Sequence, residues 1–206
     1  MTERTIDAVV FDIGGVLLDW SPTYLYEELI PDEAQRTHFL TNVATPAWNH
    51  RQDEGRPWAE AVAELSALHP EHAEWIEAYD TGWLKMVNGV FSDTAAVLTE
   101  LQSAGVPTYA LTNFSAEKWE VAKEAFDILT HFDGEVVSGV ERTAKPDEKI
   151  YRILIDRYSL NPRRTFYTDD MAYNVEGARA VGLDAEVFTG AANLRVQLAA
   201  RGLSHT

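Results

Sequence analysis

The sequence predicts an α/β protein in which a helical lobe is inserted into a parallel sheet. In the second half of the chain, short apolar segments that end in polar residues alternate with helical patterns, which is typical of parallel α/β organisation. The segment AVVF at 8–11 is apolar without alternation, as in a strand covered on both faces. No further strand of this kind occurs between about residues 20 and 90, although strand-to-helix connections usually span only ~2–6 residues. We therefore expect an inserted lobe there.

The first predicted strand ends in Asp12, which is followed by Gly14 and Gly15. Ligands of open parallel sheets bind beyond the carboxyl ends of the strands, so Asp12 occupies the position of a reactive group. The glycines allow unusual backbone angles and leave room for a ligand close to the main chain. The same stretch also fits a bend in which Asp12 only caps a turn, and taken alone it favours neither interpretation.

Helical patterns fill the predicted lobe. The apolar residues of 57–68 recur at the spacing of an amphipathic helix with a proline in its first turn, and those of 75–86 indicate a second helix. Five of the six tryptophans lie in or at the edge of the lobe. We expect most of them to pack in its core, since aromatic residues at helical spacing usually do so.

After the lobe, Ser92 is predicted to cap a helix, and the strand predicted at 106–111 leads to Thr112 and Asn113. Ser115 is predicted to cap the following helix. A second polar pair therefore ends a second strand.

A third strand predicted at 136–137 precedes Lys145 and Pro146. Pro146 fits the first turn of a helix, where a cation such as Lys145 opposes the helix dipole. A nearby anion would explain this lysine, and a side chain that extends into water is the alternative.

The fourth predicted strand, RRTFYT at 163–168, ends in Asp169 and Asp170. Adjacent carboxylates repel each other, and a hard divalent cation with oxygen ligands, above all Mg²⁺, would hold them together. In the alternative interpretation, one acid caps the next helix while the other faces solvent. The segment at 184–188 predicts a last strand at the edge of the sheet, before a terminal helix.

The composition describes an ordinary globular chain with a strongly acidic balance. Hydrophobic residues make up 46% and charged residues 24%, so a sizeable core can form. The formal net charge of −16 argues against long-range attraction to nucleic acid or an anionic membrane, but not against a small anion. The chain has no cysteine and therefore no disulfide or thiolate site. Because no signal core or membrane-spanning run is present, we expect a cytoplasmic protein.

The polar residues singled out above share one location, at or just beyond the carboxyl ends of predicted strands. They are Asp12, Thr112, Asn113, Lys145, Asp169 and Asp170. A carboxylate nucleophile, hydroxyl and amide donors, a fixed cation and a pair of metal-binding acids are the parts needed to transfer a phosphoryl group through an aspartyl-phosphate.

With these residues in place, the chain resembles the haloacid dehalogenase-like (HAD) hydrolase superfamily. Its four motifs occur in order as FDIGGV, LTN, KPD and YTDD, and the resemblance covers nearly the whole chain. It implies a Rossmann-like core domain over residues 1–18 and 91–206 and a helical cap domain over residues 19–90. It also implies a phosphatase that hydrolyses a small phosphate monoester, so that the expected partner is a small phosphorylated metabolite.

The resemblance implies a catalytic role for two residues and a substrate-binding role for three. Asp12 would be the nucleophile, and Thr112 and Asn113 would bind the phosphate. Lys145 would bridge the nucleophile and the phosphate, and would therefore serve both catalysis and substrate binding.

The resemblance also implies a Mg²⁺ site. Asp170, assisted by Asp169, would hold the ion together with Asp12 and the backbone carbonyl of Gly14.

Gly14 departs from the family pattern, because most family phosphatases carry there a second aspartate that acts as general acid and base. A group of this kind contributes ~10²–10⁴-fold to the rate, so we expect slower turnover and a strong dependence on leaving-group basicity. A water molecule or a cap side chain would have to replace it, and the candidates are Asp19, Trp48, His50 and Arg51.

Two other functions compete with the phosphatase. A metal-independent 2-haloacid dehalogenase would use Asp12 to displace halide from carbon, but that branch does not usually retain the pair Asp169 and Asp170. A non-catalytic HAD-like binding protein would share the fold, since a fold alone does not establish function. The other motif residues argue against this last interpretation.

Overall fold

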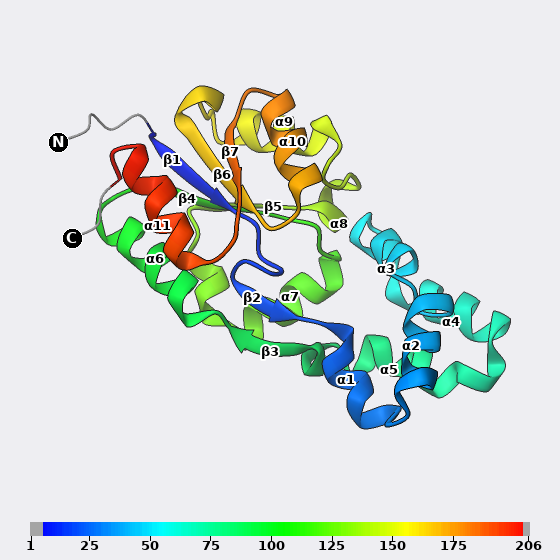
Figure 1. Cartoon of the computed structure of the whole chain (residues 1–206). Helices are drawn as coiled ribbons and strands as arrows, with labels where there is room; N and C mark the ends of the chain where they lie inside the picture. Colours follow the sequence, from blue (N-terminus) through cyan, green and yellow to red (C-terminus); the bar gives the residue numbers. More distant parts are fainter. Residues whose placement is uncertain (1–5, 204–206) are drawn as a thin grey trace.

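A parallel sheet of five strands forms the centre of the computed structural model, which describes residues 6–203 (Figure 1). The strands are β1 (Ala8–Phe11), β4 (Thr108–Thr112), β5 (Gly134–Val137), β6 (Thr165–Asp169) and β7 (Asp184–Val187). They are arranged in the order β5-β4-β1-β6-β7, with Val10 of β1 opposite both Tyr109 and Tyr167. The α/β Rossmann-like fold is therefore confirmed, and β7 is the edge strand that the sequence predicts.

Strand β1 is buried on both faces, which explains its unbroken apolar sequence. Val9 and Phe11 belong to one apolar cluster and Val10 belongs to another, because successive side chains of a strand point to opposite faces. The first cluster includes α6 (Ser92–Ser103) and α11 (Ala191–Ala200). The second includes α9 (Glu148–Arg157) and α10 (Ala172–Ala180). Helices on both faces hold the carboxyl end of β1 in a fixed position.

The helix caps in this half of the chain agree only partly with the prediction. The Ser115 hydroxyl accepts a hydrogen bond from Lys118 N at 3.2 Å and caps α7 (Ala116–Ala125), as expected. Ser92, in contrast, is the first residue of α6 rather than its cap. The residue before it is fixed by a backbone hydrogen bond from Phe91 N to Leu17 O at 2.9 Å.

The prediction that Pro146 starts a helix is wrong. Helix α9 begins two residues later, because the Asp147 side chain accepts a hydrogen bond from Lys149 N at 2.8 Å and caps the helix. Lys145 therefore lies outside the helix, in the loop between α8 (Ser138–Glu141) and α9.

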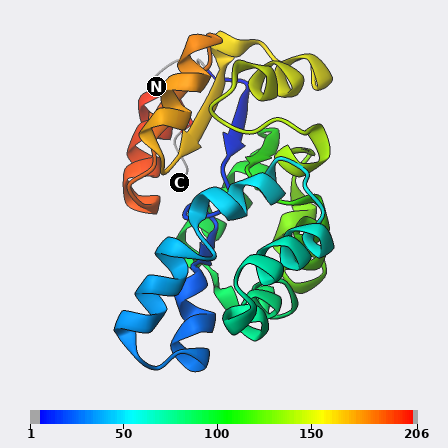
Figure 2. The ribbon, with the colours of Figure 1, turned by 90° about the vertical axis from the view of Figure 1, so that its right-hand side faces the viewer.

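Five α-helices lie in the chain between residues 20 and 87 and form what we call the helical lobe. They are α1 (Pro22–Leu29), α2 (Glu33–Asn42), α3 (Pro46–Asp53), α4 (Trp58–Leu68) and α5 (Ala73–Thr81). Figures 1 and 2 show the lobe beyond the carboxyl ends of the central strands. The predicted helix at 57–68 is present as α4. The pattern at 75–86 is divided, because α5 ends before Gly82 and a 3₁₀ turn follows at Trp83–Met86.

A two-stranded antiparallel ribbon, formed by β2 (Leu18–Trp20) and β3 (Val87–Val90), lies where the chain enters and leaves the lobe. This ribbon is absent from the prediction, because strands of three and four residues are too short to show a period. The boundaries of the core and cap domains stay a prediction. Within residues 6–203, no helix is both long and apolar enough to cross a membrane.

Aromatic side chains form much of the core of the lobe. The Trp58 ring stacks on Tyr79 with a centroid distance of 5.7 Å, and Trp48 meets the edge of each of these rings. Trp58 also joins the lobe to the core, because its indole N–H donates to Ser115 Oγ at 2.8 Å and its backbone N–H donates to Glu117 Oε1 at 3.0 Å. These bonds hold the lobe against the start of α7.

Candidate active site

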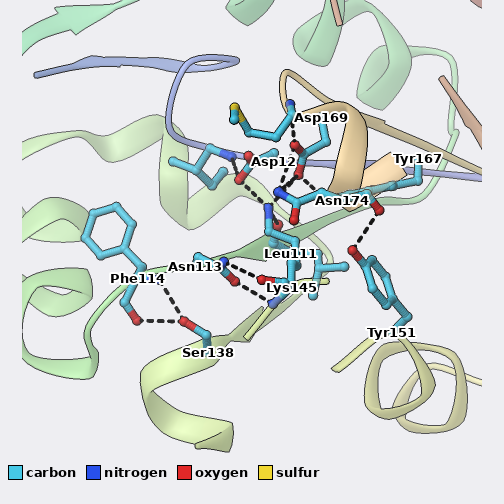
Figure 3. A network of polar contacts seen from close by, with 12 residues as sticks. Asp12, Leu111, Asn113, Phe114, Ser138, Lys145, Tyr151, Tyr167, Asp169 and Asn174 are labelled. Atoms are coloured by element: carbon cyan, nitrogen blue, oxygen red, sulfur yellow. Dashed lines mark hydrogen bonds and ion pairs between the residues drawn. The ribbon is translucent and has the colours of Figure 1, made fainter. Parts of the chain in front are cut away.

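Three of the predicted residues meet at the carboxyl edge of the sheet. Asp12 follows β1, Asp169 ends the neighbouring strand β6, and the loop before α9 brings Lys145 between them (Figure 3). Strand β4 lies on one side of β1 and β6 lies on the other, so the strand order changes direction at β1. Open α/β sheets bind ligands at such a switch point.

Lys145 is a buried lysine whose ammonium group is fully engaged. Its Nζ lies 2.8 Å from Asp12 Oδ1 and 2.7 Å from Asp169 Oδ2, and it donates to Leu111 O at 3.1 Å. Burial opposes the charge on the lysine, but the two carboxylates outweigh burial and raise its pKa. The ammonium is therefore a permanent cation in the site.

Asn113 fixes the main chain at Lys145. Its Oδ1 accepts a hydrogen bond from Lys145 N at 2.8 Å, and its Nδ2 donates to Lys145 O at 3.0 Å. The side chain of Asn113 thus holds the loop that delivers the lysine, and it also borders the cavity described below. Thr112, its neighbour at the end of β4, is only 1% exposed. The predicted contacts of both residues with phosphate stay predictions.

Asp169 accepts hydrogen bonds on both carboxylate oxygens. Oδ1 accepts from Met171 N at 2.8 Å, both oxygens accept from Asn174 Nδ2 at 3.0–3.1 Å, and Oδ2 accepts a short hydrogen bond from Tyr167. Burial favours the neutral acid, but Lys145 and these donors outweigh it and lower the pKa of Asp169. Asn174 is not among the predicted site residues, and its only signal is its place in the segment NVEGA at 174–178, shortly after the acid pair.

Asp12 is in a less favourable electrostatic position than Asp169. Burial raises its pKa to about 8, although Lys145 and the hydrogen bond from Ile13 N, at 2.6 Å to Oδ1, favour the ionised form. The negative charge of Asp169 contributes to this rise. One lysine therefore serves two buried acids, and additional positive charge is needed to keep Asp12 ionised at neutral pH.

Asp12, Asp169 and Asp170 together form a cluster of acids that could hold a metal ion, with ligand atoms within 4.8 Å of one another. The Asp170 carboxylate lies against Gly15, where an added Cβ would be 2.6 Å from Asp170 Oδ2, and Gly15 has a φ of +74°. Gly15 is therefore required both by its conformation and by the acid beside it.

Gly14 differs from Gly15, because its backbone does not have a positive φ. A Cβ at this position would meet no atom within 4 Å, and the residue borders the cavity. The expectation that both glycines serve unusual backbone angles is therefore wrong for Gly14. A side chain at position 14 would point into open space.

The residues present fit a Mg²⁺ ion. Carboxylate oxygens are the ligands this ion prefers, and among the described residues hydrogen bonds reach Asp12 only at Oδ1. The other oxygen of Asp12 and the carboxylate of Asp170 are thus the groups of the cluster that remain available as metal ligands. Three acids and one lysine also leave an excess of negative charge that a divalent cation would balance.

A cavity of about 660 Å³ separates the edge of the sheet from the helical lobe. Its core side includes Asp12, Gly14, Asn113, Lys145, Asp170 and Asn174. Its lobe side includes Leu40, Pro46, Asn49, His50, Asp53 and Tyr79. The cavity can therefore hold a small molecule within reach of Asp12.

The four candidates for the missing acid and base are placed differently. His50 borders the cavity. Asp19 accepts hydrogen bonds from Tyr24 and Asn88, each at 2.9 Å, at the entrance to the lobe. Trp48 packs in the aromatic core of the lobe, and Arg51 is exposed. A further acid that was not among the four, Asp53, also borders the cavity.

An aspartate and a lysine thus lie together at the switch point of a parallel α/β sheet. A family model described as haloacid dehalogenase-like hydrolase matches residues 6–182, so the chain belongs to that family.

Comparisons with individual proteins agree with this assignment. The sesquiterpene phosphatase astK of Aspergillus oryzae is 26% identical over 182 residues, which cover 87% of this chain and 88% of that protein. A HAD-family enzyme of Bacteroides thetaiotaomicron, solved as a magnesium complex, superposes with a TM-score of 0.70 at 18% identity, covering 90% of this chain and 94% of that one. A crystal structure of a dehalogenase gives a TM-score of 0.71 at 20% identity, with coverages of 97% and 99%. At such identities the structural likeness shows the fold alone.

Proposed function

We propose that this protein is a magnesium-dependent phosphatase that hydrolyses a small phosphate monoester through an aspartyl-phosphate on Asp12. The observation that carries the proposal is the position of Asp12, which is next to Lys145 at 2.8 Å and within one acid cluster with Asp169 and Asp170. The similarity of this chain to a sesquiterpene phosphatase, over most of both chains, supports phosphate ester hydrolysis.

In the first step, one oxygen of the Asp12 carboxylate attacks phosphorus, and the other remains available to Mg²⁺. The bond between phosphorus and the leaving-group oxygen breaks, and its electron pair leaves with that oxygen. In the second step, water attacks the aspartyl-phosphate, which releases inorganic phosphate and restores the carboxylate.

Lys145 has two functions in this scheme. It keeps Asp12 oriented through its contact at 2.8 Å, and its fixed charge opposes the charge that develops on the phosphoryl oxygens. Thr112 and Asn113 would bind the phosphate from the end of β4. Because Asn113 also holds the backbone of Lys145, its loss would affect both phosphate binding and the position of the lysine.

Asp12, Asp170 and the carbonyl of Gly14 would hold Mg²⁺, with Asp169 assisting. When bound, the ion supplies positive charge that keeps Asp12 ionised and draws electrons from the phosphoryl group. Asp169 itself is saturated by Lys145, Met171 N and Asn174, so it acts by keeping the lysine between the two acids.

The test is a side-by-side assay of an aryl phosphate and 2-chloropropionate, each with Mg²⁺ and with a chelator. The proposal predicts hydrolysis of the phosphate ester that is lost on chelation and restored by added Mg²⁺. Release of chloride in the presence of chelator, without phosphatase activity, would instead show the dehalogenase chemistry and contradict the proposal.

A further inference from the structure

We propose that Asp53, at the end of α3 in the helical lobe, is the general acid and base of this enzyme and replaces the carboxylate that Gly14 lacks. The inference rests on the phosphatase function proposed above. It assigns a catalytic residue that neither the motifs nor their spacing indicate.

The position of Asp53 is the first argument. It borders the large cavity together with Asp12, Gly14 and Asn113. It also borders a smaller adjoining cavity, again together with Gly14 and Asn113. Because the space over the Gly14 Cα is open, Asp53 faces from the lobe the same space that a side chain at position 14 would enter from the core.

The surroundings of Asp53 form the second argument. Its Oδ2 accepts a hydrogen bond from Asn49 Nδ2 at 3.2 Å, and among residues 6–203 no basic side chain lies within 4.0 Å of its carboxylate. Lys118, which borders the smaller cavity, bonds instead to the carboxylate of Asp80 and to Asp80 O at 2.9 Å. The Asp53 carboxyl group is therefore held in place but is not neutralised by a cation.

The ionisation of Asp53 suits proton transfer. Burial raises its pKa to about 7, whereas the backbone N–H of Ser115 lowers it and the neighbouring Glu54 raises it. The residue also ends α3, where the negative end of the helix dipole disfavours a carboxylate. At neutral pH both forms are populated, as an efficient acid and base requires.

Other polar groups around the cavity are less suitable. The His50 side chain is 44% exposed and its Nε2 lies 3.7 Å from Glu54. Burial raises the pKa of Tyr79 far above neutrality, so its hydroxyl is a weak acid. Asp170 belongs to the acid cluster of the proposed metal site. Asp53 is thus the cavity residue with both the position and the ionisation that the reaction needs.

The two steps then balance. Protonated Asp53 donates its proton to the leaving-group oxygen while the bond from that oxygen to phosphorus breaks, and the product alcohol departs. The Asp53 carboxylate next accepts a proton from the water that attacks the phosphoryl group on Asp12. Inorganic phosphate leaves, and Asp53 is again protonated.

The experiment compares Asp53→Asn with the unaltered protein on phosphate esters of graded leaving-group basicity. Rates are measured in single turnover with saturating Mg²⁺, so that product release does not mask the chemical step. If Gly14 leaves the enzyme without a proton donor, the rate should depend steeply on leaving-group basicity. If Asp53 donates the proton, this dependence should be shallow. We expect the unaltered protein to show the shallow dependence.

In Asp53→Asn, alkyl phosphate hydrolysis should fall by ~10²–10⁴-fold, because the alkoxide then leaves without a proton. Hydrolysis of an aryl phosphate with a stable phenolate should change far less. Asparagine has the same shape and can still accept the bond from Asn49, so thermal melting should show a folded protein. Glu74→Gln is the control, since it removes an exposed carboxylate of α5 in the same lobe, away from the cavity, and should leave both rates unchanged.

The double variant Gly14→Asp with Asp53→Asn sharpens the test. The backbone and the open space at position 14 accept a side chain, so the new carboxylate should restore part of the alkyl phosphatase rate. A double variant no faster than Asp53→Asn would contradict the claim that both positions serve the same oxygen.

Equal losses on alkyl and aryl esters, or an unchanged dependence on leaving-group basicity in Asp53→Asn, would overturn the role of Asp53 while leaving the phosphatase function intact. A lack of phosphatase activity in the unaltered protein would overturn both.

Discussion

The two walls of the cavity differ in how their polar groups are paired. On the core wall, Lys145 has three partners and both oxygens of Asp169 accept hydrogen bonds. In the lobe, five buried polar atoms of the described chain have no hydrogen-bond partner, namely Nε1 of Trp20 and Trp48, Oε1 of Gln52, Nε of Arg56 and Nδ1 of His72. Asn174 Oδ1 on the core wall also has no partner, but Lys145 and Asp169 are fully paired, whereas the unpaired groups of the lobe are spread over five residues.

This difference separates two tasks. Charges held rigidly by backbone and side-chain bonds are suited to stabilise a transition state, because they need no rearrangement during the reaction. Buried polar atoms without partners cost free energy, which a ligand or a shift of the lobe can recover. We therefore expect substitutions in the core wall to affect chemistry and folding strongly, and substitutions in the lobe wall, apart from the proposed proton donor Asp53, to affect selectivity.

The largest effect should come from Asp12→Asn. The amide keeps the shape of the carboxylate but is not a nucleophile, so kcat for an aryl phosphate should fall by ~10³-fold or more. The control is Asp19→Asn, in which the aspartate bonded to Tyr24 and Asn88 at the lobe entrance is replaced. Comparable losses in both variants would contradict the special role of the core wall.

Lys145→Met should have the next largest effect, this time on folding. It leaves Asp12 and Asp169 buried without their cation, and removing one partner of a buried ion pair costs about 3–5 kcal/mol. Lys118→Met provides the comparison, because Lys118 pairs with Asp80 at the contact between lobe and core. We expect its cost to be about 1 kcal/mol. Urea unfolding in the presence of chelator measures both, and equal costs would remove the distinction between the walls.

Asp170→Asn should affect the metal ion rather than the fold. Asp170 is exposed, so the free energy of unfolding should change by about 0.5 kcal/mol or less. The Mg²⁺ concentration for half-maximal activity should rise by at least ~10-fold, since a charged ligand is lost. A magnesium titration of the rate checks this expectation, and an unchanged titration would place the ion elsewhere.

The smallest effect concerns the pH dependence of stability. The folded protein keeps a proton on Asp53 up to about pH 7, whereas an unfolded aspartate loses it near pH ~3.9. The stabilisation from this group is complete below the lower value and is lost as pH rises through the higher one. Between about pH 4 and pH 7, the free energy of unfolding of Asp53→Asn should therefore fall less than that of the unaltered protein. The difference should be on the order of 1 kcal/mol after allowing for partial exposure of Asp53. Parallel curves of unfolding free energy against pH would contradict the raised pKa.

The core was more predictable from the sequence than the lobe, for a physical reason. A residue at the end of a buried parallel strand such as β1 or β6 must lie at the carboxyl edge of the sheet, so Asp12 and Asp169 meet once the two strands are neighbours. The hydrogen bonds of Asn174 and the place of Asp53 depend instead on how helices pack. Helix packing is set by side-chain shape over the whole contact, and the local pattern around Asp53 carries no trace of it.

The proposed function depends on a covalent phosphoryl group on Asp12. Trapping this phosphoryl group is the most direct test of the proposed function. The enzyme would be mixed with a phosphate ester and Mg²⁺, quenched in acid during turnover and reduced with borohydride, which converts an aspartyl-phosphate to homoserine. Peptide mass spectrometry should then find homoserine at position 12, and none when Mg²⁺ is chelated. Homoserine at another aspartate, or none under conditions in which the aspartyl-phosphate should accumulate, would contradict the account.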